Sequence, residues 1–424
     1  EYQDYFTVSI ILQLMLCQTD AEIIIDRKEF TRDKFDDLKV KTSYEITEFQ
    51  IKYSDDKTSH KLTKDDFSNG NGHDTALSDL FASWKNRRIS EKDAKVKLCL
   101  AWDRPTIDDP ITNFLRPIQE QFLPFSTITF VFDGNLFWPE EGLPPKTWRK
   151  FNSAIKAGLI DRESFLTFCN ELSISLEMPK ASLDLKNPGA IEKVIMMQAG
   201  KLGIGIFPND NLNIEDVIYK LATEVKHSRA MGNSLYTSTL INRLGLIIDY
   251  GKFDQRFPVD SVHQIILDDE IERLHGTIQD KKHVIITGNP GSGKSWFVDE
   301  YIDKLQNRGS KVIHYNCFHS LQDTYGLDRI RITSLYGNLV SQIMENFPKL
   351  VEYKNTIFGA DKEELENLLQ LIEEDCYLIV DGLDHIDREY ELHKDFIAKS
   401  ETEIISEFLE IKFPTKIEIL NSTF

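Results

Sequence analysis

The sequence has no apolar run long enough to cross a membrane. The longest run near either end, Val8–Cys17, is about half the roughly twenty residues that a spanning helix needs. It also lacks the basic flank and the small-residue cleavage site of a signal peptide. We therefore expect a buried helix at this position and a cytoplasmic protein.

Cysteine is scarce as well. The five cysteines are scattered along the chain without a C-x-x-C pair, which argues against both a disulfide framework and a zinc site. They are predicted to be thiols of the core, at positions Cys17, Cys99, Cys169, Cys317 and Cys376.

The chain has 424 residues, of which 41% are hydrophobic and 28% charged, as in a soluble globular protein of two to three domains. This composition excludes a fibre or a disordered tail. The sequence begins at Glu1 without a methionine, and its last residues, Lys416–Phe424, have the pattern of a strand. We therefore expect a fragment of a longer protein.

The formal net charge of −19 opposes nucleic-acid binding in general, but the charge is unevenly distributed. Residues 351–424 hold 19 acidic and 7 basic side chains. A basic stretch earlier in the chain favours either a strip that faces phosphates or a solvated helix end. It consists of Lys85, Arg87, Arg88, Lys92, Lys95 and Lys97, opposed by Glu91 and Asp93.

Helix and strand signals alternate over residues 1–140, which predicts an N-terminal α/β domain. After a Pro-rich segment, residues 141–261 are mostly helical and predict a connector or accessory region, with one possible strand at Leu172–Leu176. Residues 262–424 combine helices with strongly apolar strands such as Tyr377–Val380. Continuous apolar strands are typical of a parallel sheet covered on both faces.

Between a predicted strand and a predicted helix lies the motif G-x-x-x-x-G-K-S. Glycines allow backbone N–H groups to wrap phosphates, because a Cβ would block the approach. In this interpretation Lys294 neutralises the phosphates of ATP, and Ser295 offers its hydroxyl to Mg²⁺ at the positive end of the helix. The alternative is a structural glycine-rich turn. The loop residues predicted to bind nucleotide are Gly288, Pro290, Gly291, Ser292, Gly293, Lys294 and Ser295.

A second motif, Leu-Ile-Val-Asp-Gly-Leu-Asp-His, follows downstream. Asp381 ends a buried apolar strand, which is where a phosphate-binding fold places the carboxylate that directs Mg²⁺. Asp384 is predicted either to orient the attacking water or to cap the next helix. His385 is interpreted as a neighbouring polar residue rather than a base.

These two motifs together resemble the STAND class of signal-transduction NTPases, particularly its NACHT-like branch, which usually has an acid where His385 stands. The resemblance covers residues 262–424 and implies a P-loop NTPase. In that class a C-terminal sensor meets a trigger and the core binds or exchanges ATP. Protomers then oligomerise and switch on an N-terminal effector, so we expect a sensor beyond these residues.

The N-terminal region contains a second candidate site. The predicted strand Tyr44–Tyr53 places Glu48, Gln50 and Lys52 on one face. One strand upstream, Asp37 is the acid on the polar face, opposite the apolar side chains of that strand. An amphipathic edge strand would explain the alternation equally well.

An initial helix, an acid on one strand and Q-x-K on the next resemble the PD-(D/E)XK restriction-endonuclease-like nucleases, in their Q-x-K variant. The resemblance implies phosphodiester hydrolysis with a cation held by Asp37, the side-chain carbonyl of Gln50 and the backbone carbonyl of Ile51. Lys52 would position the nucleophilic water or stabilise charge on the phosphate.

Gln50 stands where such nucleases more usually have a carboxylate, so the cation site carries one negative charge less. Glu48, on the same face, either compensates for this charge or is solvated. Glu22 and Glu29 are further candidate acids of the site. The alternative to a nuclease is a related domain that does not cut.

A nuclease-like domain joined to a STAND-type ATPase resembles the antiviral STAND (Avs) proteins of bacteria and archaea. The resemblance implies a phage trigger, such as a terminase or portal protein, and ATP- and Mg²⁺-dependent assembly into a homo-oligomer, expected to be a tetramer. The assembled nuclease domains would degrade double-stranded DNA. Two other functions stay open: a nucleotide-switched scaffold with a non-cutting N-terminal domain, and a restriction or repair ATPase stimulated by DNA alone.

Overall fold

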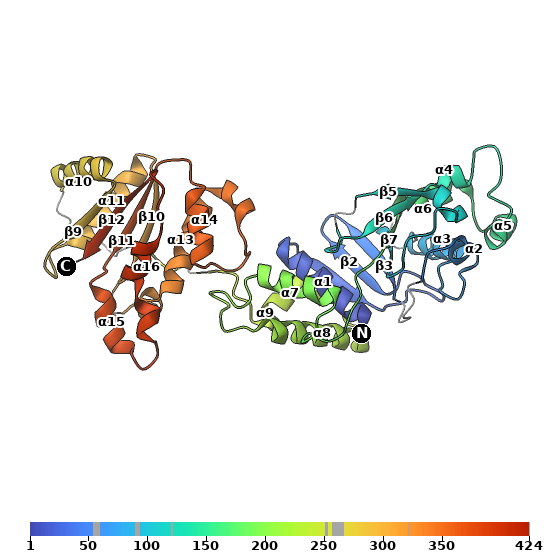
Figure 1. Ribbon diagram of the computed structural model, residues 1–424, viewed down its shortest axis with the longest axis horizontal. Helices are drawn as coiled ribbons and strands as arrows, with labels where there is room; N and C mark the ends of the chain where they lie inside the picture. Colours follow the sequence, from blue (N-terminus) through green and yellow to red (C-terminus); the bar gives the residue numbers. More distant parts are fainter. Residues whose placement is uncertain are drawn as a thin grey trace. The chain divides into compact units, whose positions relative to one another are not determined.

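The chain folds into two compact units, each built on its own β-sheet (Figure 1). One unit comprises Glu1–Gly200 and Ile214–Leu246, and the other Lys201–Asn213 and Ile247–Phe424. The fold is mixed α/β, as predicted. The computed structural model describes residues 1–53, 60–89, 94–119, 122–250, 253–256, 267–320 and 322–423.

The first unit contains an eight-stranded mixed sheet with the order β5-β6-β7-β4-β3-β2-β1-β8. Strands β1, β2 and β3 form an antiparallel meander, and β3 continues in parallel with β4, which is parallel to β7. The strands are β1 (Ala21–Ile25), β2 (Leu38–Thr42), β3 (Ile46–Lys52), β4 (Ala94–Leu100), β5 (Leu115–Ile118), β6 (Ile128–Phe132), β7 (Leu172–Leu176) and β8 (Leu235–Tyr236).

Helix α1 (Tyr2–Leu16) is buried along nearly its whole length. Phe6 packs edge-on against Phe49 of β3, and α1 also contacts α8 (Ile214–Met231) and α9 (Thr237–Leu244). A helix that is apolar all round needs cover on every side, and the sheet and these helices supply it. The predicted buried helix is therefore confirmed. Its last turn ends at Cys17, which is exposed, whereas the other four cysteines are buried as predicted.

Apart from the last of them, Ala190–Lys201, the remaining helices of this unit pack with the sheet around an aromatic core. Phe137, Trp148 and Phe165 lie at its centre, with ring centroids 4.8 to 5.7 Å from one another where the rings meet. The helices are α2 (Lys64–Asn69), α3 (Leu77–Arg87), the 3-10 helix η1 (Pro110–Phe114), α4 (Gly134–Phe137), α5 (Arg149–Lys156), α6 (Arg162–Glu171) and α7 (Ala190–Lys201).

The two units differ from the predicted three-part division at 140/141 and 261/262. Leu172–Leu176 is a strand, as predicted, but it pairs with both β4 and β6 inside the first sheet. Most of the predicted connector therefore completes the N-terminal fold, because a strand inserted in a sheet belongs to that sheet. The predicted boundary at 261/262 lies outside the described residues.

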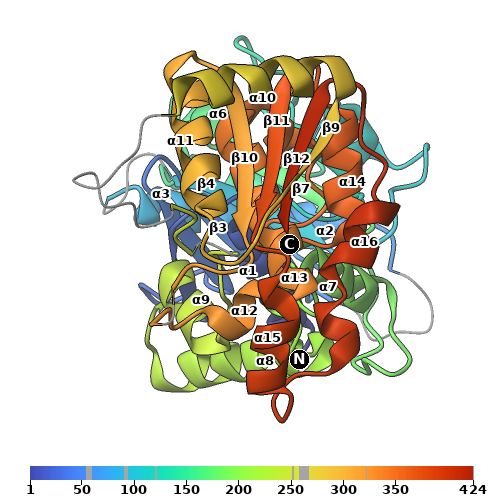
Figure 2. The same cartoon turned by 90° about the vertical axis from the view of Figure 1, so that its left-hand side faces the viewer.

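The second unit contains a four-stranded parallel sheet with the order β10-β11-β12-β9 (Figure 2). Alternate residues of its strands face two separate apolar clusters, one against α13, α14 and α16 and the other against α10 and α11. The predicted parallel sheet with two covered faces is confirmed. The strands are β9 (His283–Thr287), β10 (Lys311–Asn316), β11 (Cys376–Asp381) and β12 (Ile417–Thr423).

The helices of the second unit follow its strands closely. Helix α11 begins within the glycine loop after β9, and α15 begins shortly after β11. They are α10 (Asp268–Lys281), α11 (Lys294–Asn307), α12 (Gly326–Arg329), α13 (Ile332–Asn346), η2 (Pro348–Tyr353), α14 (Lys362–Gln370), α15 (His385–His393), η3 (Lys399–Thr402) and α16 (Ile404–Glu410). Among the described residues, no helix is long and apolar enough to cross a membrane.

Residues 201–213 belong to the second unit because their backbone pairs with residues near 358. Ile357 and Phe358 donate backbone hydrogen bonds to Lys201 and Leu202 at 2.8 and 3.1 Å. Gly203 has φ +95°, and a Cβ there would lie 2.9 Å from the backbone of Gly359. Both the backbone angle and the close approach therefore require glycine at this position.

We expect Gly203→Ala to lower the free energy of unfolding of the second unit by roughly 1–3 kcal/mol, because the backbone strain and the contact with Gly359 add. Thermal unfolding followed by calorimetry measures this loss. The control is Gly200→Ala, where a Cβ meets nothing within 4 Å among the described residues and φ is not positive. Equal stability of the two variants would contradict the proposed close approach.

Candidate functional sites

The glycine loop joins β9 directly to α11, in the strand–loop–helix order that the motif predicts. Gly291 and Gly293 have φ of +77° and +88°, and Gly293 is the N-cap of α11. A non-glycine residue would be strained at both positions. The loop thus lies across the N-terminus of α11, where backbone N–H groups and the helix dipole favour an anion.

Lys294 folds back over this loop. Its Nζ donates hydrogen bonds to the carbonyl oxygens of Gly288 at 2.8 Å and Asn289 at 3.3 Å. The charge is therefore held above the concave side of the loop. A cavity of about 650 Å³ opens beside it, lined by Pro290, Gly291, Gly293, Lys294, Ser295 and Trp296 on the loop side and by Phe318, Asp384, His385 and Arg388 on the other.

Asp381 is the last residue of β11 and is buried. Its Oδ1 accepts a hydrogen bond from the Ser422 hydroxyl. Burial raises the pKa of the Asp381 carboxyl, and hydrogen bonds from the side chains of Ser422 and Ser295 lower it. The structure therefore brings Ser295 of the loop and Asp381 together, as the motifs predict for a shared Mg²⁺.

Ser422 was not identified from the sequence. It lies on β12, which is placed between β9 and β11, so the loop strand and the Asp381 strand are not neighbours. Its position in the polar end of β12, Asn421–Thr423, was the available signal. Its meaning depends on strand order, which a single sequence does not contain.

Asp384 and His385 lie on the opposite wall of the cavity from the loop. Asp384 is at the N-cap position of α15, yet within the described part of the chain its side chain makes no capping hydrogen bond, so the predicted capping role is wrong. The His385 ring stacks on Phe318 with centroids 4.2 Å apart. Burial, and then the nearby Arg388 charge, lower the pKa of His385, so the ring is neutral at pH 7.

In the first unit, the carboxylate of Asp37 lies beside β3, just beyond the last β2–β3 residue pair, Leu38–Phe49. Its Oδ2 accepts the Ile51 backbone N–H at 2.6 Å and the Gln50 side-chain amide, and its Oδ1 accepts Gln3 Nε2 at 2.9 Å. The predicted residues Asp37, Gln50 and Ile51 are therefore brought together at the end of the β2–β3 pair.

Burial raises the pKa of Asp37 to about 6, while the Ile51 amide and then the Lys52 charge act to lower it. Lys52, the last residue of β3, thus adds a positive charge close to this carboxylate. The Gln50 amide presents its nitrogen to Asp37, whereas a cation would need its carbonyl oxygen. Turning the amide by half a turn exchanges the two ends.

Glu48 is fully buried, so the predicted solvated alternative is wrong. It pairs with Lys39 at 2.9 Å and with Arg87, which also holds Asp33. Burial raises the pKa of Glu48 and the Arg87 charge lowers it. Two cations are needed here because an unpaired buried carboxylate would be strongly destabilising.

The two further candidate acids contact partners other than Asp37. Glu29 joins the same buried network through Lys39, at 2.5 Å. Glu22 accepts a hydrogen bond from Ser234 at 2.7 Å. It is opposite Lys41 in the β1–β2 ladder, three residue pairs from the pair Ile25–Leu38, which is next to Asp37. Three pairs correspond to roughly 10 Å of strand. The geometry therefore does not bring Glu22 to Asp37.

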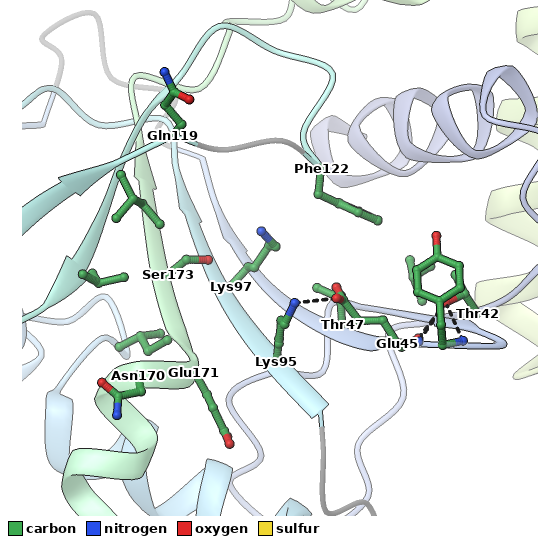
Figure 3. Close-up of a pocket in the computed structure, with 15 residues that line it drawn as sticks. Thr42, Glu45, Thr47, Lys95, Lys97, Gln119, Phe122, Asn170, Glu171 and Ser173 are labelled. Carbon is green, nitrogen blue, oxygen red and sulfur yellow. Dashed lines mark hydrogen bonds and ion pairs between the residues drawn. The ribbon is translucent and has the colours of Figure 1, made fainter.

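The predicted basic stretch does not form one surface. Arg87 is buried in the network, Arg88 pairs with Glu171 and Lys85 pairs with Asp161. Lys95 pairs with Glu45 at a pocket of about 400 Å³ that Lys97 and Phe122 also line (Figure 3). Neither prediction fits the whole stretch where it is described, because Arg87 and Lys97 are buried whereas Lys85 and Lys95 are exposed. Lys92, with Glu91 and Asp93, lies outside the described residues.

Residues 261–415 match the family model "Nephrocystin 3, N-terminal". The matched region contains β9, the glycine loop, β10 and β11 with Asp381. The match supports a region similar to the STAND and NACHT-like ATPases and does not extend to the N-terminal unit. The comparison with curated proteins finds no match to this chain.

The raised pKa of Asp37 predicts a pH-dependent effect of Asp37→Asn. Between the unfolded pKa near 4 and the folded pKa of about 6, the folded protein holds the proton more tightly, so wild-type stability falls as pH rises. Without divalent cations, we expect the variant to be more stable by about 1–3 kcal/mol above pH 6. This gain disappears as pH falls from 6 to 4.

Urea unfolding at pH 8 and at pH 4.5, both with EDTA, measures this difference. Asp108→Asn, at an exposed carboxylate, is the matched control and is expected to have little effect at either pH. If Asp37→Asn raised the free energy of unfolding equally at both pH values, the cost would not come from ionising a buried Asp37 carboxylate.

Proposed function

We propose that this protein is a nucleotide-gated, Mg²⁺-dependent DNA nuclease of an antiviral sensor. The observation that carries the proposal is the placement of Lys294 and Ser295 on one cavity, with the buried Asp381 hydrogen-bonded to Ser295 beside it. The nuclease is the effector that this nucleotide site would control.

In the proposed nucleotide site, ATP places its phosphates in the glycine loop. The backbone N–H groups and Lys294 meet the negative charge, which the helix end also favours. Mg²⁺ would lie between the Ser295 hydroxyl and Asp381, directly or through water. These two groups already contact each other, and a cation there would supply the charge that the buried Asp381 needs.

The nucleotide interpretation is also supported by the cavity itself. It has a cationic loop wall and an opposite wall with Asp384 and Arg388. In this proposal Asp384 orients the attacking water, because its side chain is not used as a cap.

In the proposed nuclease site, Mg²⁺ is held by Asp37, the turned Gln50 amide and the backbone carbonyl of Ile51. The order of helix, three-stranded meander and parallel fourth strand supports this assignment, as does the cluster of Asp37, Gln50 and Lys52 at one end of β3. Asp37 is desolvated, so a divalent cation would relieve the cost of its charge. Lys52 would position the nucleophile.

The biological role extends this biochemical proposal. A phage protein such as a terminase or portal protein would act as the trigger, and ATP and Mg²⁺ would support a homo-oligomer, proposed to be a tetramer, in the cytoplasm. The clustered nuclease domains would then degrade double-stranded DNA. The support for this role is the resemblance of the motifs, and the match of residues 261–415 bears on the ATPase region alone.

Lys294→Ala is expected to weaken ATP binding by roughly 10- to 100-fold or more, because it deletes a charge-assisted contact of about 1.5–3 kcal/mol. Calorimetric titration with ATP and Mg²⁺ measures this. Lys304→Ala is the matched control, since Lys304 lies on the same helix but pairs with Asp268. An ATP affinity for Lys294→Ala equal to that of the control would refute the nucleotide site.

Asp37→Ala and Lys52→Ala are each expected to reduce Mg²⁺-dependent cleavage of linear double-stranded DNA by roughly 100-fold or more, with assembly intact. The assay contains ATP and candidate phage triggers, and light scattering follows assembly. Lys95→Ala, which removes a lysine paired with Glu45, is the control. Persistent cleavage by both variants would place the active site elsewhere.

The same assay separates the two alternatives. A scaffold whose N-terminal domain only binds would assemble on the trigger and not cleave. A restriction or repair ATPase would be stimulated by DNA without any protein trigger. Cleavage that requires the trigger and is lost in Lys52→Ala and Lys294→Ala supports the nucleotide-gated nuclease.

A further inference from the structure

A second cluster of possible metal ligands lies around α2 of the first unit. The side chains of His60, Asp66 and His73 each offer one ligand atom, and these atoms all lie within 4.8 Å of one another. They come from three places in the chain: just before α2, within α2 and after α2. Neither the nucleotide site nor the nuclease site uses them.

The backbone around this cluster holds the three residues in place. Leu62 N donates to Asp103 O at 3.0 Å, and Asp103 N donates to His60 O at 2.8 Å, so His60 is fixed to the chain that follows β4. Helix α2 ends at Gly70, which has a left-handed backbone. This turn brings the chain back toward His60, and the His60 and His73 ring centroids are 4.8 Å apart.

Trp102 supports both imidazoles. Its ring centroid lies 4.5 Å from that of His60 and 5.0 Å from that of His73, and both pairs have edge-to-face geometry. The two rings are therefore held by packing as well as by backbone hydrogen bonds. Rigid support of this kind favours metal binding, because less side-chain freedom is lost when the ligands are fixed.

Asp66 gives an independent indication of a ligand. Its side chain is fully buried, and Oδ2 accepts hydrogen bonds from the backbone N–H and the hydroxyl of Thr63, both at 2.8 Å, and contacts His60 Nε2 at 3.1 Å. Oδ1 is also buried but has no hydrogen-bond partner among the described residues. An unsatisfied buried carboxylate oxygen is destabilising, and a cation would satisfy it.

We propose that His60, Asp66 and His73 bind one divalent transition-metal ion of the Zn²⁺ class. Two imidazole nitrogens and one carboxylate oxygen suit Zn²⁺, Co²⁺ or Ni²⁺, whereas Mg²⁺ prefers oxygen ligands only. Metal–ligand bonds of about 2.0–2.1 Å put tetrahedral ligand atoms about 3.4 Å apart. Small side-chain rotations reduce the present separations to that value, and a water would complete the coordination.

The bound ion would act as a clamp. It would join α2 and the turn after it to the segment around His60, which is hydrogen-bonded to Asp103. Residues 101–103 follow β4, and Ala101 N donates to Lys52 O at 3.0 Å, so they are hydrogen-bonded to the end of β3. Metal binding would thus stabilise the neighbourhood of Lys52 without supplying the Mg²⁺ of the proposed nuclease site. The scarcity of cysteine gave no sign of this site, because its ligands are histidine and aspartate.

The test uses the full chain, treated with EDTA and then titrated with Zn²⁺ or Co²⁺ in excess Mg²⁺, which occupies oxygen-only sites. We expect one tightly bound equivalent and a visible Co²⁺ absorption band without sulfur-to-metal charge transfer. His60→Ala and His73→Ala should weaken binding by roughly 100-fold or more, and Thr63→Ala, which keeps all three ligands, by roughly tenfold.

Two controls exclude other sites. His227→Ala removes an exposed histidine of α8, and Cys17→Ser removes the exposed thiol, and neither should change the affinity. Circular dichroism of each variant without metal confirms that it folds. Absence of Zn²⁺ binding in the wild type, wild-type affinity in His73→Ala, or loss of binding in Cys17→Ser would each overturn the proposal.

Discussion

The cost of burying a carboxylate determines how both sheets are organised at their functional ends. Asp37 lies next to β3 and Asp381 ends β11, and burial raises the pKa of each. A buried charge persists only where donors or cations compensate for the lost water. The few donors present, from Gln3, Gln50 and Ile51 in one unit and Ser295 and Ser422 in the other, surround these acids and form the two candidate sites.

The face of the first sheet beside these residues depends on a second set of buried charges. Arg87 of α3 is held by Asp33 and by Glu48 of β3, and Lys39 of β2 completes the network. Because removing one partner would leave an uncompensated buried charge, α3, β2 and β3 are fixed relative to one another. This network fixes β3, which carries Gln50 and Lys52, against α3.

Local features were predictable from the sequence. The glycine loop, the Asp381 strand and the Q-x-K strand are contiguous patterns, and the structure has each element where the pattern places it. Features that depend on distant partners were not predictable. Arg87 was predicted to belong to a basic stretch, because its partners Asp33 and Glu48 are far from it in sequence. Ser422 gains its role only from strand order.

The structure departs from the predicted division at 140/141 for the same physical reason. Leu172–Leu176 looked like an isolated strand in a helical region, and only its pairing with β4 and β6 assigns it to the first sheet. The His60, Asp66 and His73 cluster likewise has no fixed spacing that marks it, since the turn after α2 creates it. Sequence patterns therefore located the chemistry of single segments better than the contacts between segments.

The docking of residues 201–213 onto the second unit has a topological consequence. The chain passes from one unit to the other at 200/201, returns at 213/214 and passes again at 246/247. No single proteolytic cut can then yield two intact halves, since a cut in any one connection leaves the other two.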